Sequence, residues 1–192
     1  MPLLMQPMAR TLRARRRSRT ERSAPAAGAW RRVTKSAAET DRLGRAIGRS
    51  MRGGEVVALY GELGSGKTEL VRGLAAGLGA SPRAVSSPTF VLIHEYYGRT
   101  RLAHADLYRI ESATELPHIG LSDYEDGRTV LAIEWADKAG EELPGDRLDV
   151  HLRHQGPTTR EITLTPTGPQ ARRLLALVRA QPVAGRRGRF RR

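Results

Sequence analysis

The stretch from Gly61 to Thr68 constrains the fold and the chemistry of this chain more than any other feature. It reads Gly-Glu-Leu-Gly-Ser-Gly-Lys-Thr and matches the pattern G-x-x-x-x-G-K-[ST] at every fixed position. Glycines permit backbone angles that turn successive N–H groups inward around phosphate oxygens, so the pattern predicts a phosphate-binding P-loop. Lys67 would reach the β- and γ-phosphates, and the Thr68 hydroxyl would bind Mg²⁺. The residues predicted to bind the nucleotide here are Glu62, Leu63, Gly64, Ser65, Gly66, Lys67 and Thr68.

The residues on both sides of this loop support the prediction. Residues 55–60 form a short apolar run that is typical of a buried strand. A strand, a loop and a helix N-terminus facing the phosphates are the arrangement in which a P-loop works. After the loop, apolar residues recur at helical spacing until glycines end the pattern: Leu70, Val71, Leu74 and Leu78, with Gly77 and Gly79.

The positive charge of the chain is concentrated at its two ends. The net charge is +13 over 192 residues, yet residues 36–170 contain fifteen Lys and Arg against nineteen Asp and Glu. Residues 1–35 carry ten Lys and Arg with one acid, and residues 171–192 carry eight Arg with none. Basic segments with few apolar residues predict disordered arms. These arms either bind RNA through counterion release or extend into solvent, and both interpretations stay open.

The composition excludes several classes of protein. The chain contains no Cys, which excludes disulfides and thiolate metal sites. No apolar run approaches the roughly 20 residues of a membrane span. Residues 1–29 are Arg-rich and lack the apolar segment of a secretory signal. We therefore expect a cytoplasmic protein that does not enter a membrane.

Outside the loop, the sequence predicts alternating helices and strands. Ser36 to Glu39 form a capping box that opens a helix, and Pro169 helps to initiate a last short helix. Residues 147–154 and 160–165 alternate apolar and polar positions, which predicts an antiparallel hairpin. We predict an α/β fold: a P-loop NTPase-like three-layer sandwich with a mixed, mainly parallel sheet and an antiparallel C-terminal hairpin. Further strands are expected at residues 90–97, 101–105 and 130–133.

A missing residue type constrains the identity of the nucleotide base. Ras-type GTPases read guanine through an Asn-Lys-x-Asp motif, and this chain contains no Asn. ATP is therefore the favoured nucleotide.

We predict a P-loop ATPase domain over residues 34–168. A disordered Arg-rich arm is expected at residues 1–33, and a short helix with a basic tail at residues 169–192.

A P-loop enzyme also needs a carboxylate-bearing element that manages Mg²⁺ and the attacking water. Glu134 is the strongest candidate, because it follows four apolar residues at the carboxyl end of a predicted strand. Ligands of open α/β sheets bind at those ends. Asp106 is the second candidate, since it follows a shorter apolar strand.

Three nearby side chains have more than one interpretation. Thr89, in Ser-Pro-Thr-Phe, is either a switch threonine that senses Mg²⁺ or the γ-phosphate, or a residue that caps a turn. Trp135 either stacks on a base or a partner, or packs in the core. His104 and Asp106 lie two residues apart and resemble a metal pair. Without a Cys or a third ligand nearby, metal ligation by this pair is not expected.

The order and spacing of these motifs resemble the bacterial TsaE family, the ATPase component of tRNA threonylcarbamoyladenosine synthesis. Besides the P-loop, the most specific motifs are Asp-Leu-Tyr-Arg at residues 106–109 and Glu-Trp at residues 134–135. The resemblance covers roughly residues 36–165. Further matching residues are Ser87, Pro88, Thr89, Phe90, His104, Glu115, Leu116, Gly120, Tyr124, Leu143, Pro144, Arg160 and Glu161.

Three positions depart from the family pattern. The family usually has aromatic residues on both sides of the His104 position, where this chain has Ala103 and Ala105. A proline commonly follows the Glu-Trp pair, where this chain has Ala136. These changes concern local packing and leave the chemical groups in place.

The resemblance implies a role for each candidate residue. Lys67 and the loop bind ATP, while Thr68 and Glu134 hold Mg²⁺. Asp106 is needed for hydrolysis, and Arg160 contacts the nucleotide. Lys67, Asp106 and Glu134 are accordingly the expected catalytic residues.

The resemblance also implies a partner. Members of the family are slow ATPases that bind the TsaD–TsaB pair, the complex that transfers threonylcarbamoyl to tRNA. Their ATP turnover resets this complex for another cycle. The tRNA is then reached indirectly, through the complex. Two other functions stay open: a small-molecule phosphotransferase of the P-loop class, and an RNA-binding protein that uses its basic arms with ATP as a structural ligand.

Overall fold

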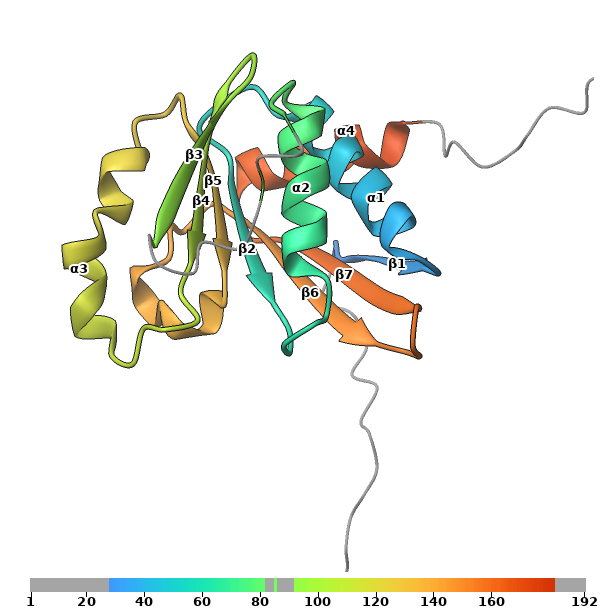
Figure 1. Cartoon of the computed structure of the whole chain (residues 1–192). Coiled ribbons are helices and arrows are strands. Elements are labelled where there is room, and N and C mark those ends of the chain that lie inside the picture. Colours follow the sequence, from blue (N-terminus) through green and yellow to red (C-terminus); the bar gives the residue numbers. More distant parts are fainter. Residues whose placement is uncertain (1–27, 82–84, 86–91, 182–192) are drawn as a thin grey trace, which may run out of the picture.

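A seven-stranded sheet in the order β1-β7-β6-β2-β5-β4-β3 forms the centre of the fold (Figure 1). The structure is a computed structural model that describes residues 28–81, 85 and 92–181. The predicted switch residue Thr89 and most of both basic arms lie outside these residues. The strands are β1 Trp30–Thr34, β2 Val56–Tyr60, β3 Ile93–Tyr97, β4 Arg101–Asp106, β5 Val130–Glu134, β6 Leu148–His154 and β7 Arg160–Pro166. The helices are α1 Ala37–Ser50, α2 Lys67–Gly77, α3 Leu116–Ile119 and α4 Pro169–Ala180, with short 3₁₀ helices at Ala113–Glu115, Leu121–Tyr124, Ala136–Lys138 and Gly140–Glu142.

The sheet is parallel at its centre and antiparallel at both sides. β2 pairs in parallel with β5 and β6, and β4 pairs in parallel with β5. The hairpin of β6 and β7 and the pairs β1–β7 and β3–β4 are antiparallel. The predicted mixed sheet with an antiparallel C-terminal hairpin is confirmed.

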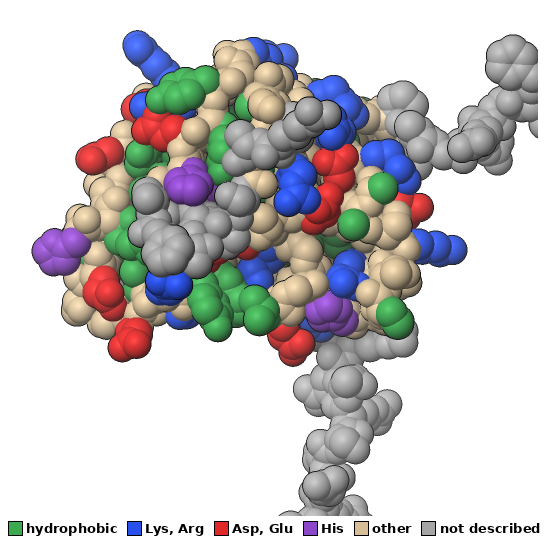
Figure 2. All heavy atoms as spheres, viewed as in Figure 1, with side chains coloured by type: hydrophobic (Ala, Val, Ile, Leu, Met, Phe, Trp, Pro, Cys, Tyr) green, Lys and Arg blue, Asp and Glu red, His purple; other side chains and the backbone are tan. Residues whose placement is uncertain are grey.

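Helices cover both faces of this sheet, which confirms the predicted three layers. α1, α2 and α4 pack on one face of the sheet (Figure 1). Charged side chains of both signs are scattered over the surface on this side of the molecule (Figure 2). α3 and the short 3₁₀ helices pack on the other face, around Leu107 and Leu116. Within the described ranges, no helix has the length and apolarity needed to cross a bilayer.

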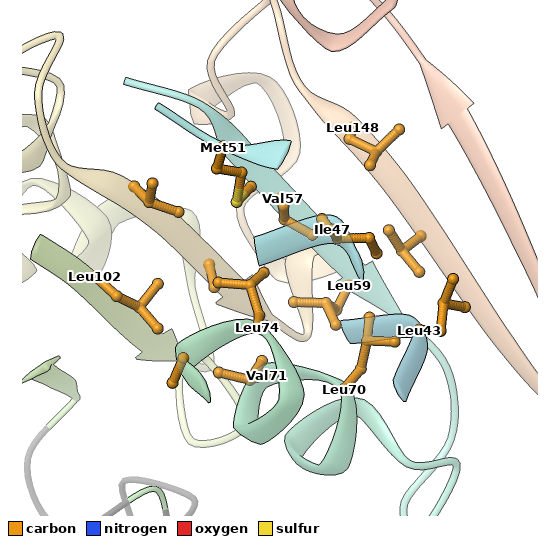
Figure 3. Close-up of a cluster of buried hydrophobic side chains, with 14 of the residues drawn as sticks. Leu43, Ile47, Met51, Val57, Leu59, Leu70, Val71, Leu74, Leu102 and Leu148 are labelled. Carbon is orange, nitrogen blue, oxygen red and sulfur yellow. The ribbon is translucent and has the colours of Figure 1, made fainter. Parts of the chain in front are cut away.

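The helix that follows the P-loop motif is held by its apolar side. Leu70 and Leu74 of α2 are fully buried and pack with Ile47 of α1 and Leu59 of β2 (Figure 3). Burying such a side chain contributes about 1.5–3 kcal/mol to stability. The apolar residues that recur at helical spacing in the sequence are therefore the ones that pack α2 against the sheet.

α1 and α2 approach each other through glycines that replace side chains at the contact. A Cβ atom at Gly48 of α1 would lie 2.2 Å from the carbonyl oxygen of Leu74. A Cβ atom at Gly73 of α2 would lie 2.1 Å from the carbonyl oxygen of Asp41. Real Cβ atoms do not approach a backbone oxygen so closely, so a larger residue would push the two helices apart.

Replacing Gly48 by Ala is therefore expected to destabilise the domain. Alanine favours a helix over glycine by about 1 kcal/mol, but overpacking costs about 1–3 kcal/mol and more where backbone must move. We expect a net loss of about 1–2 kcal/mol in urea unfolding. Gly145→Ala is the matched control, because a Cβ there meets nothing within 4 Å. Equal stability of the two variants would show that α1 and α2 separate without cost.

The predicted domain limits need correction at both ends. The arm predicted for residues 1–33 includes most of β1, which begins at Trp30 and pairs with β7 from Trp30 opposite Leu164 to Thr34 opposite Arg160. Arg31 and Arg32 suggested a solvated arm, but an edge strand is held by backbone hydrogen bonds and tolerates charged side chains. At the other end, Leu174, Leu175 and Val178 of α4 are part of the core. Within the described residues, the fold therefore extends from Trp30 to Ala180, beyond the predicted limits of 34–168.

Candidate functional site

The P-loop motif joins the end of β2 to the start of α2. Gly66, the N-cap of α2, has a left-handed backbone conformation (φ 102°, ψ 19°), which favours glycine at this position. The first N–H groups of a helix have no partner within it and favour a negative ligand. The predicted loop residues thus lie at the carboxyl edge of the parallel strands, with a helix N-terminus beside them.

Two cationic side chains donate hydrogen bonds to carbonyl groups of this loop. The Lys67 ammonium donates to the carbonyl oxygens of Gly61 (2.7 Å) and Glu62 (3.0 Å). The Arg160 guanidinium donates to those of Ser65 (3.1 Å) and Gly64 (3.3 Å). These hydrogen bonds connect four carbonyl groups of the loop to two side chains and support its backbone.

Arg160 also ties the loop to the turn between β6 and β7. Its Nη1 donates to the carbonyl oxygens of Gly156, Pro157 and Thr159, at 3.1, 3.3 and 3.1 Å. The structure thus places Arg160 beside the loop, as a support for its backbone. The predicted contact of Arg160 with the nucleotide stays a prediction.

The two candidate carboxylates lie side by side. Asp106 ends β4 and Glu134 ends β5, and the two residues are direct partners in the parallel pairing of these strands. Both are buried, with 6% and 2% of their surface exposed. The Thr68 hydroxyl donates to Glu134 Oε2 at 3.1 Å, which brings the predicted pair of Mg²⁺ ligands together.

His104 is the second partner of Glu134. This fully buried histidine lies two residues before Asp106 on β4, and its Nε2 is 2.9 Å from Glu134 Oε1. One carboxylate oxygen is therefore held by His104, and the other points to Thr68. Among the described residues, no group of three or more His, Asp and Glu side chains is placed to hold a metal ion. That His104 and Asp106 are not a metal pair stays a prediction.

Asp106 has a structural partner of its own. Its Oδ1 accepts a hydrogen bond from the backbone N–H of Tyr108 at 2.9 Å, which shapes the turn after β4. A hydroxyl and a single carboxylate are oxygen donors of the kind Mg²⁺ takes when phosphates and waters supply the rest. Thr68 and Glu134 fit that donor set, and Asp106 lies next to them.

Trp135 lies over the P-loop lysine. The Lys67 ammonium is 3.7 Å from the centre of the Trp135 ring, a cation–π contact. Trp135 has a left-handed backbone conformation (φ 58°), which is uncommon for a bulky residue and occurs most often at functional sites. The ring packs partly against the second core cluster, and the Tyr108 ring lies 5.0 Å away. Both interpretations of Trp135 thus keep a structural basis.

The surroundings of Lys67 disfavour the charged form of its side chain. Burial lowers the pKa of the Lys67 ammonium, and the carboxylates of Glu134, Asp106 and Asp137 act in the other direction. The ammonium is therefore a poorly solvated charge, and negative groups compensate it only in part. Such a site gains from an additional anion close to the amine.

An open hollow of about 350 Å³ adjoins the loop. The rings of Tyr60 and His151 stack at its edge, with centres 4.4 Å apart and planes 11° from parallel. The Tyr60 hydroxyl donates to Asp149 at 3.2 Å, and burial and that carboxylate raise the pKa of Tyr60. This stack was not predicted from the sequence, in which an aromatic residue directly before the P-loop was the available signal. The hollow is lined by Tyr60, Gly61, Glu62, Trp135, Asp137 and His151.

The sheet, the loop between β2 and α2, and the carboxylates at the ends of β4 and β5 define a P-loop NTPase-like protein. The family model described as "Threonylcarbamoyl adenosine biosynthesis protein TsaE" matches residues 34–162. The chain belongs to the TsaE family, which acts in tRNA threonylcarbamoyladenosine biosynthesis.

Individual relatives agree with this assignment. A tRNA threonylcarbamoyladenosine biosynthesis protein TsaE from Treponema pallidum is 41% identical over 132 residues, which are 69% of this chain and 97% of that protein. The TsaE protein of Bacillus subtilis is 40% identical over 140 residues, 72% of this chain and 85% of that protein. The crystal structure of Bacillus subtilis YdiB superimposes with a TM-score of 0.66 at 31% identity, over 79% of this chain and 94% of that one.

Proposed function

We propose that this chain binds and hydrolyses Mg²⁺-ATP as the ATPase component of tRNA threonylcarbamoyladenosine biosynthesis. One observation carries the proposal: the Thr68 hydroxyl lies 3.1 Å from Glu134 Oε2, at the start of the P-loop helix. This is the pairing of P-loop hydroxyl and strand-end carboxylate with which P-loop NTPases hold Mg²⁺. ATP is favoured over GTP because the chain has no Asn for a guanine-reading motif.

Each residue of the site has a defined task in this proposal. The loop amides and Lys67 bind the β- and γ-phosphates, and the anion relieves the poorly solvated ammonium. Thr68 and Glu134 would hold Mg²⁺, which offsets phosphate charge when bound. His104 keeps Glu134 in that orientation through its 2.9 Å contact. Asp106, next to Glu134, orients the attacking water.

The partners in this proposal are the TsaD and TsaB proteins, in the cytoplasm, with tRNA reached through the complex. ATP turnover by this chain resets the TsaD–TsaB transferase for another cycle. The open hollow beside the loop exposes Trp135 and His151 at the mouth of the site, where a protein partner would sense the nucleotide. Membership of the TsaE family supports the pathway.

The test is a pull-down of purified TsaD and TsaB with the full chain, with and without Mg²⁺-ATP. We expect capture of both proteins, an amount of complex that changes with ATP, and ATPase activity in the assembled complex. Lys35→Ala is the control, because Lys35 is exposed and lies outside the site. No capture under either condition would contradict the partner assignment. ATP consumption that instead requires a small metabolite would favour a phosphotransferase.

A further inference from the structure

Residues of β1, α1 and α4 line a groove of about 400 Å³. The helices α1 and α4 cover the same face of the sheet as the P-loop helix α2 (Figure 1). β7 and β6 separate β1 from β2 in the sheet, so the groove shares no residue with the candidate ATP site. Five arginines line it, which we call the arginine groove: Arg32 of β1, Arg42, Arg45 and Arg49 of α1, and Arg179 of α4.

The groove is more basic than the domain around it. Residues 36–170 carry more acids than bases, yet the only acidic residue among those lining the groove is Glu39. Arg42, Arg45 and Arg49 are spaced by three and four residues, which brings them to one face of α1. The basic character therefore comes from the arrangement of the side chains and not from the average composition.

Three of these arginines have no carboxylate partner among the described residues: Arg32, Arg49 and Arg179. The other two pair with acids of their own helix. Arg42 lies 3.6 Å from Glu39, and Arg45 makes two hydrogen bonds to Asp41. At least three positive charges in the groove thus lack a neutralising group in the described fold.

The unpaired guanidinium groups are held in place. Those of Arg32 and Arg179 lie over the Trp30 ring, 5.2 and 5.9 Å from its centre. Arg49 donates to the Gln181 amide oxygen at 3.3 Å, and the Gln181 amide nitrogen is fixed by the Ala46 carbonyl at 2.8 Å. Side chains fixed in advance lose less conformational entropy on binding, so this arrangement favours an anionic ligand.

We propose that the arginine groove binds the phosphate backbone of tRNA directly. Guanidinium groups match phosphate oxygens in charge and in paired hydrogen-bond geometry. The family acts in tRNA modification, which makes an RNA the polyanion of this pathway. The inference goes beyond the proposed ATPase, in which tRNA is reached only through TsaD and TsaB. It also assigns RNA contact to the folded domain, where the sequence had suggested the basic arms.

The experiment measures binding of the full chain to an unmodified tRNA transcript over a series of KCl concentrations. The groove variant is Arg32→Gln/Arg49→Gln/Arg179→Gln. The control variant is Arg128→Gln/Arg153→Gln/Arg173→Gln, which removes the same charge from exposed positions outside the groove. Each lost phosphate contact lowers the slope of log affinity against log salt by roughly 0.7–0.9.

We expect the groove variant to lose about tenfold or more in affinity and about two units of salt slope. The control variant should lose less than about threefold. Equal losses in the two variants would overturn the proposal. So would a groove variant that binds tRNA normally but has lost binding to poly-glutamate, because the groove would then fit an acidic protein.

Two measurements keep the result interpretable. ATPase activity and the TsaD–TsaB pull-down should be unchanged in the groove variant, so failure of tRNA binding is distinct from failure of the proposed ATPase. If the triple variant is unstable, Arg49→Gln alone decides the question. It removes a guanidinium that bonds the Gln181 amide, and it should lower the slope by roughly 0.7–0.9. An unchanged slope in this variant counts against the groove.

Discussion

Replacing Lys67 by Ala is expected to abolish tight binding and hydrolysis of ATP while the domain stays folded. The Lys67 amine lies inside the P-loop, bonded to the carbonyl oxygens of Gly61 and Glu62, and has no role in the apolar core. Burial lowers the pKa of the Lys67 ammonium, so its charge is poorly solvated in the fold. We expect loss of at least 100-fold in ATPase rate, since such a cationic contact acts on the transferred charge.

The measurement is ATP titration calorimetry with a phosphate-release assay, beside a thermal unfolding curve. Lys35→Ala is the control, since it removes the same charge from an exposed position. We expect the melting temperature of Lys67→Ala to stay within a few degrees of the parent, as about 1 kcal/mol shifts it by roughly 2–4 °C at this size. Normal ATPase activity in a folded Lys67→Ala protein would overturn the proposed function as a whole.

The sequence predicted the centre of the fold because each signal there is local. The P-loop motif sets its own strand, turn and helix, and apolar runs before Asp106 and Glu134 mark neighbouring strands. Parallel strands end at the same edge of a sheet, and Asp106 and Glu134 are direct partners at the ends of β4 and β5.

The sequence did not predict features that depend on strand register and on contacts between distant segments. The contact of His104 with Glu134 requires β4 and β5 to pair in one register, and the Tyr60–His151 stack requires these residues to be partners in β2 and β6. The support of the loop by Arg160 depends on the hairpin turn, 95 residues from Ser65 in the sequence. None of these contacts produces a pattern that is visible in a short stretch of the sequence.

β1 was missed for a different reason. Its sequence, Trp-Arg-Arg-Val-Thr, continues the basic character of the preceding segment. Its stability comes from pairing with β7 and from Trp30, whose ring packs against the core and carries two guanidinium groups. A charged edge strand is thus indistinguishable from a charged arm until its partner is known.

Variants of Glu134 and Asp106 are expected to separate the binding of Mg²⁺-ATP from its hydrolysis. Glu134 Oε2 lies 3.1 Å from the Thr68 hydroxyl, so Glu134→Ala removes a proposed Mg²⁺ ligand and should weaken both ATP affinity and turnover. Asp106→Ala should retain affinity and lower turnover by roughly 100-fold or more, because a group that positions water acts in the transition state.

The neighbours of each carboxylate provide matched variants. Asp106 also accepts the Tyr108 N–H, so Asp106→Asn, which keeps an acceptor, separates the loss of charge from the loss of that turn. Glu134→Gln keeps an oxygen and an amide near His104 and Thr68 while it removes the charge that Mg²⁺ needs. Asp106→Asn should therefore reproduce the turnover defect of Asp106→Ala with a melting temperature closer to that of the parent.

The experiment is ATP titration calorimetry at several Mg²⁺ concentrations, paired with single-turnover hydrolysis, on all four variants. The Mg²⁺ dependence of affinity should flatten in the Glu134 variants and persist in the Asp106 variants. If the Asp106 variants lose Mg²⁺-dependent affinity while the Glu134 variants lose only turnover, the two roles must be exchanged. If neither residue affects ATP hydrolysis, the strand-end carboxylates do not form the site, and the pairing of Thr68 with Glu134 is structural only.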